Sequence, residues 1–207
     1  MGFLNYMALV KHNNNSISSI TTPGTLAQGK MTLISSQTAS GSASIEFTSG
    51  IDSTYPIYRF EFISIHPASQ SDFEFQGSTN NGSSYGITIT STFFNASHRE
   101  NDTEAGFGYS GGDDLAQSTS FQHLTDNTIN NSDSNESGCL YIFNPSSTTF
   151  VKHFMSNFNT TNADPASRNS FSAGYFNSTS PINAFKFKRT SGNIDSGTIK
   201  LYGIKGD

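Results

Sequence analysis

The chain has 207 residues, a net charge of −5 and only 13% charged residues. The low share of charged residues argues against a mainly helical protein, and the acidic balance leaves no electrostatic footprint for nucleic acid. Hydrophobic residues make up only 33% of the chain, but 18 of its residues are Phe and 8 are Tyr. Because each large ring buries much apolar area, few hydrophobic positions can still build a sizeable core. We therefore expect one β-rich domain.

Residues 1–20 begin with a short apolar segment that is followed by the polar run 13–16. The apolar residues are few and are not sustained along the segment. We interpret residues 1–20 as an N-terminal arm that orders against a neighbour, or alternatively as a peripheral strand. No apolar stretch approaches the length of a membrane span, and the sequence lacks a signal-peptide pattern, so no membrane partner is expected.

Strand patterns dominate residues 21–207, which we expect to form a single β-sandwich domain. Apolar and polar residues alternate with a period of two in 44–48 and again in 87–93, where threonines occupy the outer face. The run 55–65 carries bulky residues on both parities, which is typical of a strand buried on both faces or lying at a subunit contact. Similar signals occur in 140–143, 150–154, 171–176, 184–187 and 198–204.

Turn residues separate these strands. The run 80–84, Asn-Asn-Gly-Ser-Ser, is a strong loop signal. Residues 144–147 and 191–193 are short enough to close two hairpins, the second of which would join the strand at 184–187 to the last strand. The sequence predicts an all-β, antiparallel, jelly-roll-like β-sandwich of about 8–10 strands, with at most one short helical turn.

One long polar region, 97–137, does not follow this pattern and is expected to be an insertion loop with a weak strand near 121–124. Loops of this length in a compact domain are usually functional or disordered. The region is therefore the first candidate for a recognition surface. Its candidate recognition residues are Phe107, Tyr109, Asp113 and Asp114.

Two kinds of ligand site have partial sequence signals in this region. The glycine-rich segment 106–112 lacks the Gly-Lys-Ser/Thr ending of a phosphate loop, and no helix is predicted after it. Asp113 and Asp114, with Asp102 and Glu104, could supply oxygen ligands to calcium, but the regular spacing of an EF-hand loop is absent. Solvated acidic side chains are the default interpretation, and we expect no metal and no cofactor.

Catalytic patterns are absent from the sequence. The five histidines show no paired metal-ligand spacing, and no Gly-x-Ser-x-Gly motif occurs. Cys139 precedes an apolar run and has no activating neighbour in sequence, so we expect a buried, inert thiol. Asp72 and Glu74 share a strand parity, but such pairs are common on exposed sheet faces. We therefore expect no catalytic residues and no enzyme activity.

A short basic group, Lys186, Lys188 and Arg189, lies in a predicted strand. We interpret it as part of a solvated or inter-subunit face rather than as a phosphate track.

The C-terminal sequence carries a family resemblance. The segment 180–187, SPINAFKF, is followed in 191–204 by SGNIDSGTIKLYGI, and 171–178 reads FSAGYFNS. This combination resembles the closing hairpin of tailed-bacteriophage virion proteins, often those of marine phages. The resemblance implies a jelly roll or related sandwich at the particle surface, commonly a homotrimer, and it carries over no catalytic residue. Within the pattern, Gly192 allows a tight reversal and Gly197 permits a bulge or a close backbone approach.

Three functions are open to a protein with these features. The first is a capsid decoration or cement protein that stabilises the shell through many subunit contacts with the major capsid protein or other virion proteins, since contact centres are depleted in charge. The second is a tail-fibre or knob-type module that binds surface carbohydrate through Phe107, Tyr109 and Tyr85, although Trp is absent. The third, a glycan depolymerase, is disfavoured by the lack of paired acids and by a length short for a β-helix.

Overall fold

The structure is a computed structural model, and it describes residues 31–205. Within this range the chain forms twelve β-strands and no helix, so no helix there could span a membrane. The strands are β1 (Met31–Ser42), β2 (Ser44–Phe47), β3 (Ile57–Pro67), β4 (Ser71–Ser78), β5 (Ile89–Arg99), β6 (Ala105–Tyr109), β7 (Gln122–Thr128), β8 (Glu136–Phe143), β9 (Lys152–Asn162), β10 (Ala166–Phe176), β11 (Ala184–Arg189) and β12 (Ile194–Ile204).

All twelve strands are antiparallel and form one nearly closed, barrel-like sheet. The main path runs β1-β12-β3-β8-β9-β7-β4-β11-β2, and β10, β5 and β6 branch from β9. The link between β9 and β7 is narrow, with a single residue pair, Thr128 and Asn162. At the two ends of the path, β1 and β2 follow each other in the chain, and the Gln37 amide donates to the Glu46 carbonyl at 2.5 Å.

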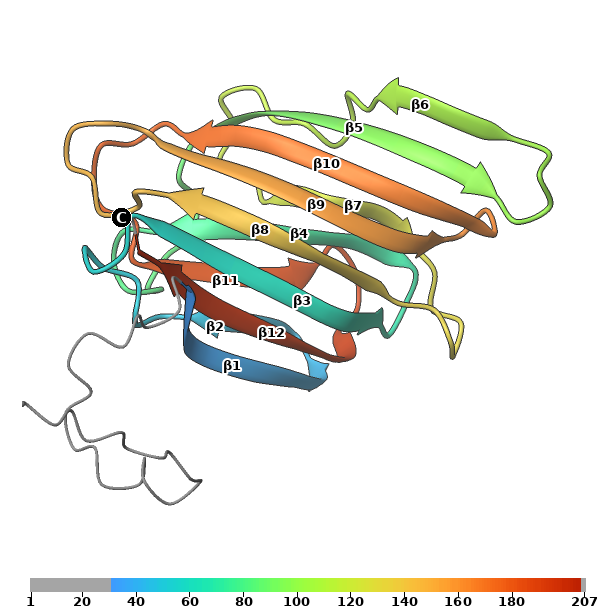
Figure 1. The fold of residues 1–207 in the computed structure, drawn as a ribbon, viewed down its shortest axis with the longest axis horizontal. Coiled ribbons are helices and arrows are strands. Elements are labelled where there is room, and N and C mark those ends of the chain that lie inside the picture. Colours follow the sequence, from blue (N-terminus) through green and yellow to red (C-terminus); the bar gives the residue numbers. More distant parts are fainter. Residues whose placement is uncertain (1–30, 206–207) are drawn as a thin grey trace, which may run out of the picture.

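The sheet has two walls that face each other (Figure 1). The larger wall contains β1-β12-β3-β8-β9-β10-β5-β6, and the smaller wall contains β2-β11-β4-β7. Four of the pairs are nested along the chain: β1 pairs with β12, β2 with β11, β3 with β8, and β4 with β7. The remaining strands, β5, β6, β9 and β10, extend the larger wall beyond this nested set.

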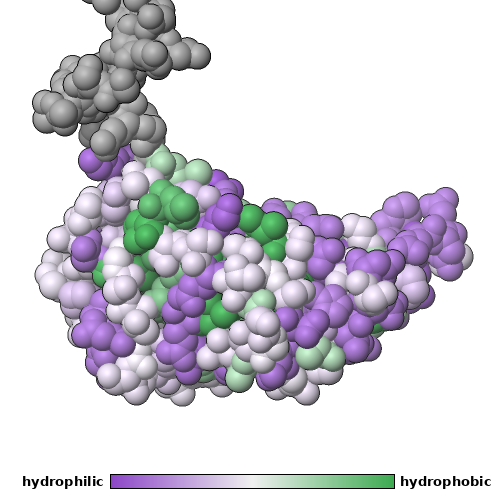
Figure 2. Space-filling model, turned by 90° about the horizontal axis from the view of Figure 1, so that it is seen from below, coloured by the Kyte–Doolittle hydropathy of each residue, from purple (hydrophilic) through white to green (hydrophobic). Residues whose placement is uncertain are grey.

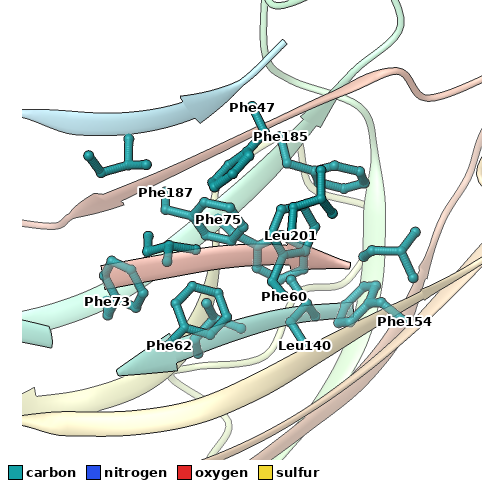
Figure 3. Close-up of a cluster of buried hydrophobic side chains, with 14 of the residues drawn as sticks. Phe47, Phe60, Phe62, Phe73, Phe75, Leu140, Phe154, Phe185, Phe187 and Leu201 are labelled. Atoms are coloured by element: carbon teal, nitrogen blue, oxygen red, sulfur yellow. The ribbon is translucent and has the colours of Figure 1, made fainter. Parts of the chain in front are cut away.

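Phenylalanine rings fill the space between the walls (Figure 3). Phe60 and Phe62 of β3 meet Phe187 of β11 with ring centroids 4.9 and 5.1 Å apart. Phe62 also lies 4.9 Å from Phe158, and Phe75 of β4 lies 5.1 Å from Phe154. All of these side chains are almost completely buried. Ring-to-ring contact across the barrel explains how a chain with so few hydrophobic residues builds a core.

The expected number of strands was too low, because the described residues contain twelve strands rather than about 8–10. The region 97–137 is not one long loop, since it holds β6 and β7. The weak strand expected near 121–124 corresponds to β7. Strands β1, β4 and β6 were not among the predicted strand segments. For β1 and β6 the reason is that a serine-rich strand and a Gly-Phe-Gly strand show little of the alternation that a half-buried strand displays.

The two expected hairpins had different outcomes. Residues 144–151, which include the predicted turn at 144–147, join β8 to β9, and these strands pair as predicted. Residues 191–193 do not close a hairpin, because β11 pairs with β2 and β4 whereas β12 pairs with β1 and β3. The tight reversal at Gly192 is present, with φ of 73°, but it carries the chain from one wall to the other.

The prediction for Gly197 is confirmed. The register between β12 and β3 shifts on both sides of Ser196, and Gly197 has a φ of 121°. A Cβ atom at Gly197 would lie 2.7 Å from the Ser64 carbonyl oxygen and 2.8 Å from the Ile65 Cα. Glycine is therefore required at this position by both the left-handed backbone and the close approach.

The basic group of β11 is divided between two environments. Lys186 pairs with Glu46 at 2.8 Å, and Lys188 pairs with Glu74. Arg189, expected on a solvated or inter-subunit face, is instead fully buried, with its Nη1 3.0 Å from Glu136. Alternation explains the division, because successive side chains of a strand point to opposite faces.

Glu74 also differs from its expected place on an exposed sheet face, because it is buried beside Lys188 and His123. The candidate N-terminal arm, residues 1–20, lies outside the described residues.

Candidate functional site

The outer face of the larger wall carries an unusual number of apolar side chains. One row across the strands consists of Met31, Ile204, Ile57 and Phe143, from β1, β12, β3 and β8. Residues that are direct neighbours across antiparallel strands share a face, so these side chains lie together on the outside of the barrel.

A second row lies one pleat further along the same strands. It contains Leu33, Tyr202, Arg59, Tyr141 and Met155. Leu33 and Met155 are 51% and 56% exposed, and the Arg59 guanidinium lies over the Tyr141 ring at 5.5 Å from its centroid. We call the two rows together the outer apolar face.

The alternation of β3 explains this face. Tyr58, Phe60 and Phe62 point into the barrel and are buried, whereas Ile57 and Arg59 point outward and are half-buried. Of the two alternatives for the run 55–65, burial of both faces does not occur within the described chain.

The outer apolar face contains a hollow of about 430 Å³. It spans four strands of the larger wall, β12-β3-β8-β9, and reaches β10. Its lining residues are Ile57, Cys139, Tyr141, Phe143, Met155, Ser156, Asn157, Phe171 and Ile204. Figure 2, which shows the molecule from below, has several separate hydrophobic patches toward one end, whereas the other end is mostly hydrophilic. Neighbouring exposed apolar side chains such as those of the two rows are typical of protein–protein contact sites.

Cys139 belongs to this hollow. It was expected to be buried and inert, but it is half-buried on the outside of β8, level with Glu61 of β3 and Asn157 of β9. The expectation failed because the apolar run that follows Cys139 alternates: Leu140 and Ile142 point inward, and Tyr141 and Phe143 point outward.

The candidate recognition residues Phe107 and Tyr109 lie on β6, the last strand of the larger wall (Figure 1). Their side chains are 75% and 61% exposed. Phe107 contacts Phe94 of β5 edge to face at 5.4 Å, and Phe94 stacks on Phe171 of β10 at 5.0 Å. Both candidates therefore lie on the surface, on the same outer side of the wall as the apolar hollow.

A polar hollow of about 340 Å³ lies on the opposite, inner side of β6. Gly106 and Gly108 leave space there, because a Cβ atom at either position would meet nothing within 4 Å. Across this space Arg168 of β10 binds both carboxylate oxygens of Asp126 at 2.6 and 2.7 Å. Burial raises the pKa of Asp126 even though Arg168 opposes that shift.

Asp113 and Asp114, the other two candidate residues, have separate roles. Asp113 lies 2.7 Å from His123 Nδ1 and accepts a hydrogen bond from the Ser110 hydroxyl at 2.5 Å. Asp114 accepts a hydrogen bond from the Tyr109 hydroxyl. Asp113 thus attaches the segment after β6 to β7, and Asp114 attaches the same segment to β6. The two aspartates do not form a shared carboxylate site.

The Asp113–His123 contact shifts the pKa of both groups. Burial alone would raise the pKa of Asp113, but the hydrogen bonds from His123 and Ser110 lower it below its usual value. Burial alone would lower the pKa of His123, yet the bond to Asp113 and the neighbouring carboxylates raise it above its usual value. Since His123 Nε2 lies 3.8 Å from Glu74, both ring nitrogens face acidic groups rather than a nucleophile.

The acidic residues weighed for calcium also bind other side chains. Asp102 lies 2.9 Å from His98, and Glu104 lies 2.9 Å from Arg99. Within residues 31–205 no group of three or more His, Cys, Asp or Glu side chains is arranged to hold a metal ion.

Tyr85, a further residue considered for stacking on sugars, is already engaged. Its hydroxyl donates to Glu46 at 3.0 Å, and its ring lies under the Lys186 ammonium at 4.7 Å. The structure therefore separates Tyr85 from the β6 candidates. The residues of the outer apolar face were not predicted as a site, although bulk on both parities of 55–65 was the signal that could have identified them.

No family model, curated protein or solved structure matches the chain.

Proposed function

We propose that the chain is a non-enzymatic structural protein of a virion surface and that its domain is a jelly roll. Support for the jelly roll comes from the nested pairs β1–β12, β2–β11, β3–β8 and β4–β7. Rolling up one long hairpin with this pairing gives two facing four-stranded walls, and jelly rolls are common among viral capsid domains. In this interpretation β5–β6 and β9–β10 are two insertions into the eight-stranded core.

The observation that carries the assembly role is the outer apolar face with its hollow. Leu33, Met155 and the hollow-lining aromatic residues remain accessible although the same strands bury a complete core on their other side. Exposed apolar area of this kind is stabilised when a partner surface removes it from water. A capsid decoration or cement protein, in contact with the major capsid protein and with further copies in a homotrimer, would use the face in this way.

The closing sequence at 191–204 supports the virion location, because it resembles the ends of tailed-bacteriophage virion proteins. The physical properties of the segment agree with a structural role. Strand β12 lies between β1 and β3 in the larger wall, and its Tyr202 and Ile204 belong to the outer apolar face. The segment thus contributes both to the barrel and to the proposed contact surface.

The proposal is tested with Met155→Glu, which places a charge in the outer apolar face. Purified chain is mixed with particles that lack it, and bound protein is measured after sedimentation. Binding is expected to weaken at least about tenfold, because burying an unpaired carboxylate costs more than the ~1.4 kcal/mol that corresponds to that factor.

The matched control is Ser53→Glu, which adds the same charge at an exposed position in the loop between β2 and β3. This variant is expected to bind like the unchanged chain. Equal binding of the Met155→Glu and Ser53→Glu variants would show that the outer apolar face does not contact the particle.

A second function, carbohydrate binding by a tail-fibre or knob-type module, is favoured by the polar hollow behind β6. Asn95 and the Asp126–Arg168 pair present donors and acceptors there, and Phe107 and Tyr109 lie on the same strand. Glycan-array binding that is lost in Arg168→Met and kept in Met155→Glu would support this alternative over the cement role.

A further inference from the structure

Strand β6 is the open end of the sheet. It pairs with β5 on one side, and no other described strand pairs with its second side. At the other end of the sheet, β1 and β2 lie beside each other, as the Gln37–Glu46 bond indicates. Figure 1 shows β6 as the outermost strand of the larger wall. An unpaired edge of this kind offers a row of backbone donors and acceptors to another strand.

Two backbone hydrogen bonds show which groups of β6 are free. Ser110 donates to the Phe93 carbonyl at 3.0 Å, and Arg99 donates to the Glu104 carbonyl at 2.9 Å. In an antiparallel pair, the backbone groups of alternate residues bond to the same neighbouring strand. The backbone N–H and C=O groups of the even-numbered residues in 104–110 therefore point toward β5. The backbone N–H and C=O groups of Ala105, Phe107 and Tyr109 therefore point away from the sheet.

The sequence of β6, Ala-Gly-Phe-Gly-Tyr, is nearly symmetric about Phe107. If a second β6 lies antiparallel with Phe107 opposite Phe107, then Ala105 lies opposite Tyr109, and a small side chain meets a large one. In this register the two strands bond through the backbone N–H and C=O groups of Ala105, Phe107 and Tyr109, which are the groups that point away from the sheet. On the other face of the strand Gly106 lies opposite Gly108, so no side chains oppose the approach of the two copies.

We propose that β6 is a pairing strand through which two copies of this chain join their larger walls into one continuous sheet, about a twofold axis at Phe107. The paired Phe107 rings extend the aromatic row that already contains Phe94 and Phe171. Strand β6 contains no charged residue that would oppose the contact. This contact is independent of the proposed virion function: it uses the edge of the wall at β6, whereas the apolar hollow lies over β12-β3-β8-β9 and reaches only as far as Phe171 of β10.

Cysteine cross-linking tests the register in a Cys139→Ser background, which removes the other thiol. The singly substituted Gly106→Cys and Gly108→Cys chains are oxidised separately and as an equimolar mixture. In the proposed register residue 106 faces only 108, as a non-hydrogen-bonded pair with Cα atoms about 4.5 Å apart, which suits a disulfide. Neither variant alone should cross-link, whereas the mixture should give a disulfide-linked dimer.

Phe107→Lys tests the contact without cross-linking, because it places two like charges opposite each other at the twofold axis. Analytical ultracentrifugation of the unchanged chain should show a concentration-dependent doubling of the mass of the smallest species, whether monomer or trimer, and Phe107→Lys should abolish that doubling. The control is Phe150→Lys, which replaces another exposed Phe, 69% accessible, outside any strand. Circular dichroism of each variant checks that the fold is kept.

Three results would overturn the proposal: no cross-linking in the mixture, equal cross-linking of a single variant, or unchanged self-association of Phe107→Lys. Because Met155→Glu should leave the β6 contact intact, its effect separates this inference from the proposed function. Loss of self-association in Met155→Glu alone would assign the contact to the outer apolar face and not to β6.

Discussion

Arg189 and Glu136 form a fully buried ion pair inside a barrel whose core is mainly apolar. Their charged atoms are 3.0 Å apart, Thr125 donates to Glu136 at 2.8 Å, and the guanidinium lies 5.3 Å from the centre of the Phe73 ring. Within the described residues, Nε and the second terminal nitrogen of Arg189 have no hydrogen-bond partner. The attraction between Arg189 and Glu136 therefore offsets only part of the free-energy cost of removing both charges from water. Removing one of the two side chains should be costly, because the other charge would stay buried without a partner.

Replacing one member, as in Arg189→Met, is expected to lower the free energy of unfolding by about 3–5 kcal/mol, because it leaves the Glu136 charge buried without its partner. Denaturant unfolding measures the loss. The double variant Arg189→Met, Glu136→Leu should recover most of it, since it removes both charges. A loss no larger than that of Arg99→Met, which breaks the exposed pair with Glu104, would contradict this account.

The contact between Asp113 and His123 makes stability depend on pH. The raised pKa of His123 means that its stabilisation is present below about pH 6.5 and is lost as pH rises through the raised value. The lowered pKa of Asp113 means that its stabilisation is lost as pH falls through the lowered value. The contact should therefore be strongest in the mildly acidic range between the two.

His123→Asn tests this dependence. The difference in melting temperature between the unchanged chain and the variant should be largest near about pH 5 and should shrink as pH rises past the raised pKa. A difference that stays constant from acidic to alkaline pH would show that His123 acts only through packing.

At the scale of the elements, close approach between neighbouring strands sets strict size limits. A Cβ atom at Gly138 of β8 would lie 2.3 Å from the Asn157 carbonyl oxygen and 2.6 Å from the Phe158 ring. Strand β9 can pair closely with β8 there only because glycine has no side chain. The same strands carry the outer apolar face, so their spacing also sets the shape of its hollow.

Gly138→Ala is expected to destabilise the fold by about 1–3 kcal/mol, because the added methyl group overpacks against backbone that cannot move freely. Thermal unfolding measures the change. Gly111→Ala is the matched control, since a Cβ atom there meets nothing within 4 Å. Equal stability of the two variants would mean that β9 can shift away from β8 without cost.

Alternation also decided which strands could be predicted from the sequence. The runs 44–48 and 55–65 were identified because large apolar residues recur every second position. Strands β1 and β6 lack that signal: β1 is rich in Ser and Thr with a single buried residue, Ala39, and all of β6 is exposed. The Phe107 and Tyr109 candidates were therefore assigned to a loop although they lie on a strand.

At the scale of the whole molecule, the sequence predicted the all-β class but not the closure of the sheet. Strand partners such as β1 and β12 are far apart in the chain, and alternation says which face of a strand is buried but not which strand lies beside it. The turn at 191–193 was predicted correctly from its residues. Its two flanking strands were paired wrongly, because alternation does not identify strand partners. The outer apolar face was missed likewise, because it emerges only when five strands are placed in register.

The proposed structural role depends on the core, on the closed sheet and on the outer apolar face together. Phe rings supply much of the core, the strand order closes that core into a barrel, and outward apolar side chains of β1, β12, β3, β8 and β9 gather on one outer face. A protein with such a face gains stability from being covered, and repeated weak contacts across a particle would give strong attachment.

Electron cryo-microscopy of the intact particle tests this claim most directly. A cement protein should form a regular array on the capsid lattice, with Met155, Tyr141 and Phe143 covered by a neighbouring subunit. Copies confined to the tail, or an array in which this face remains open to solvent, would contradict it.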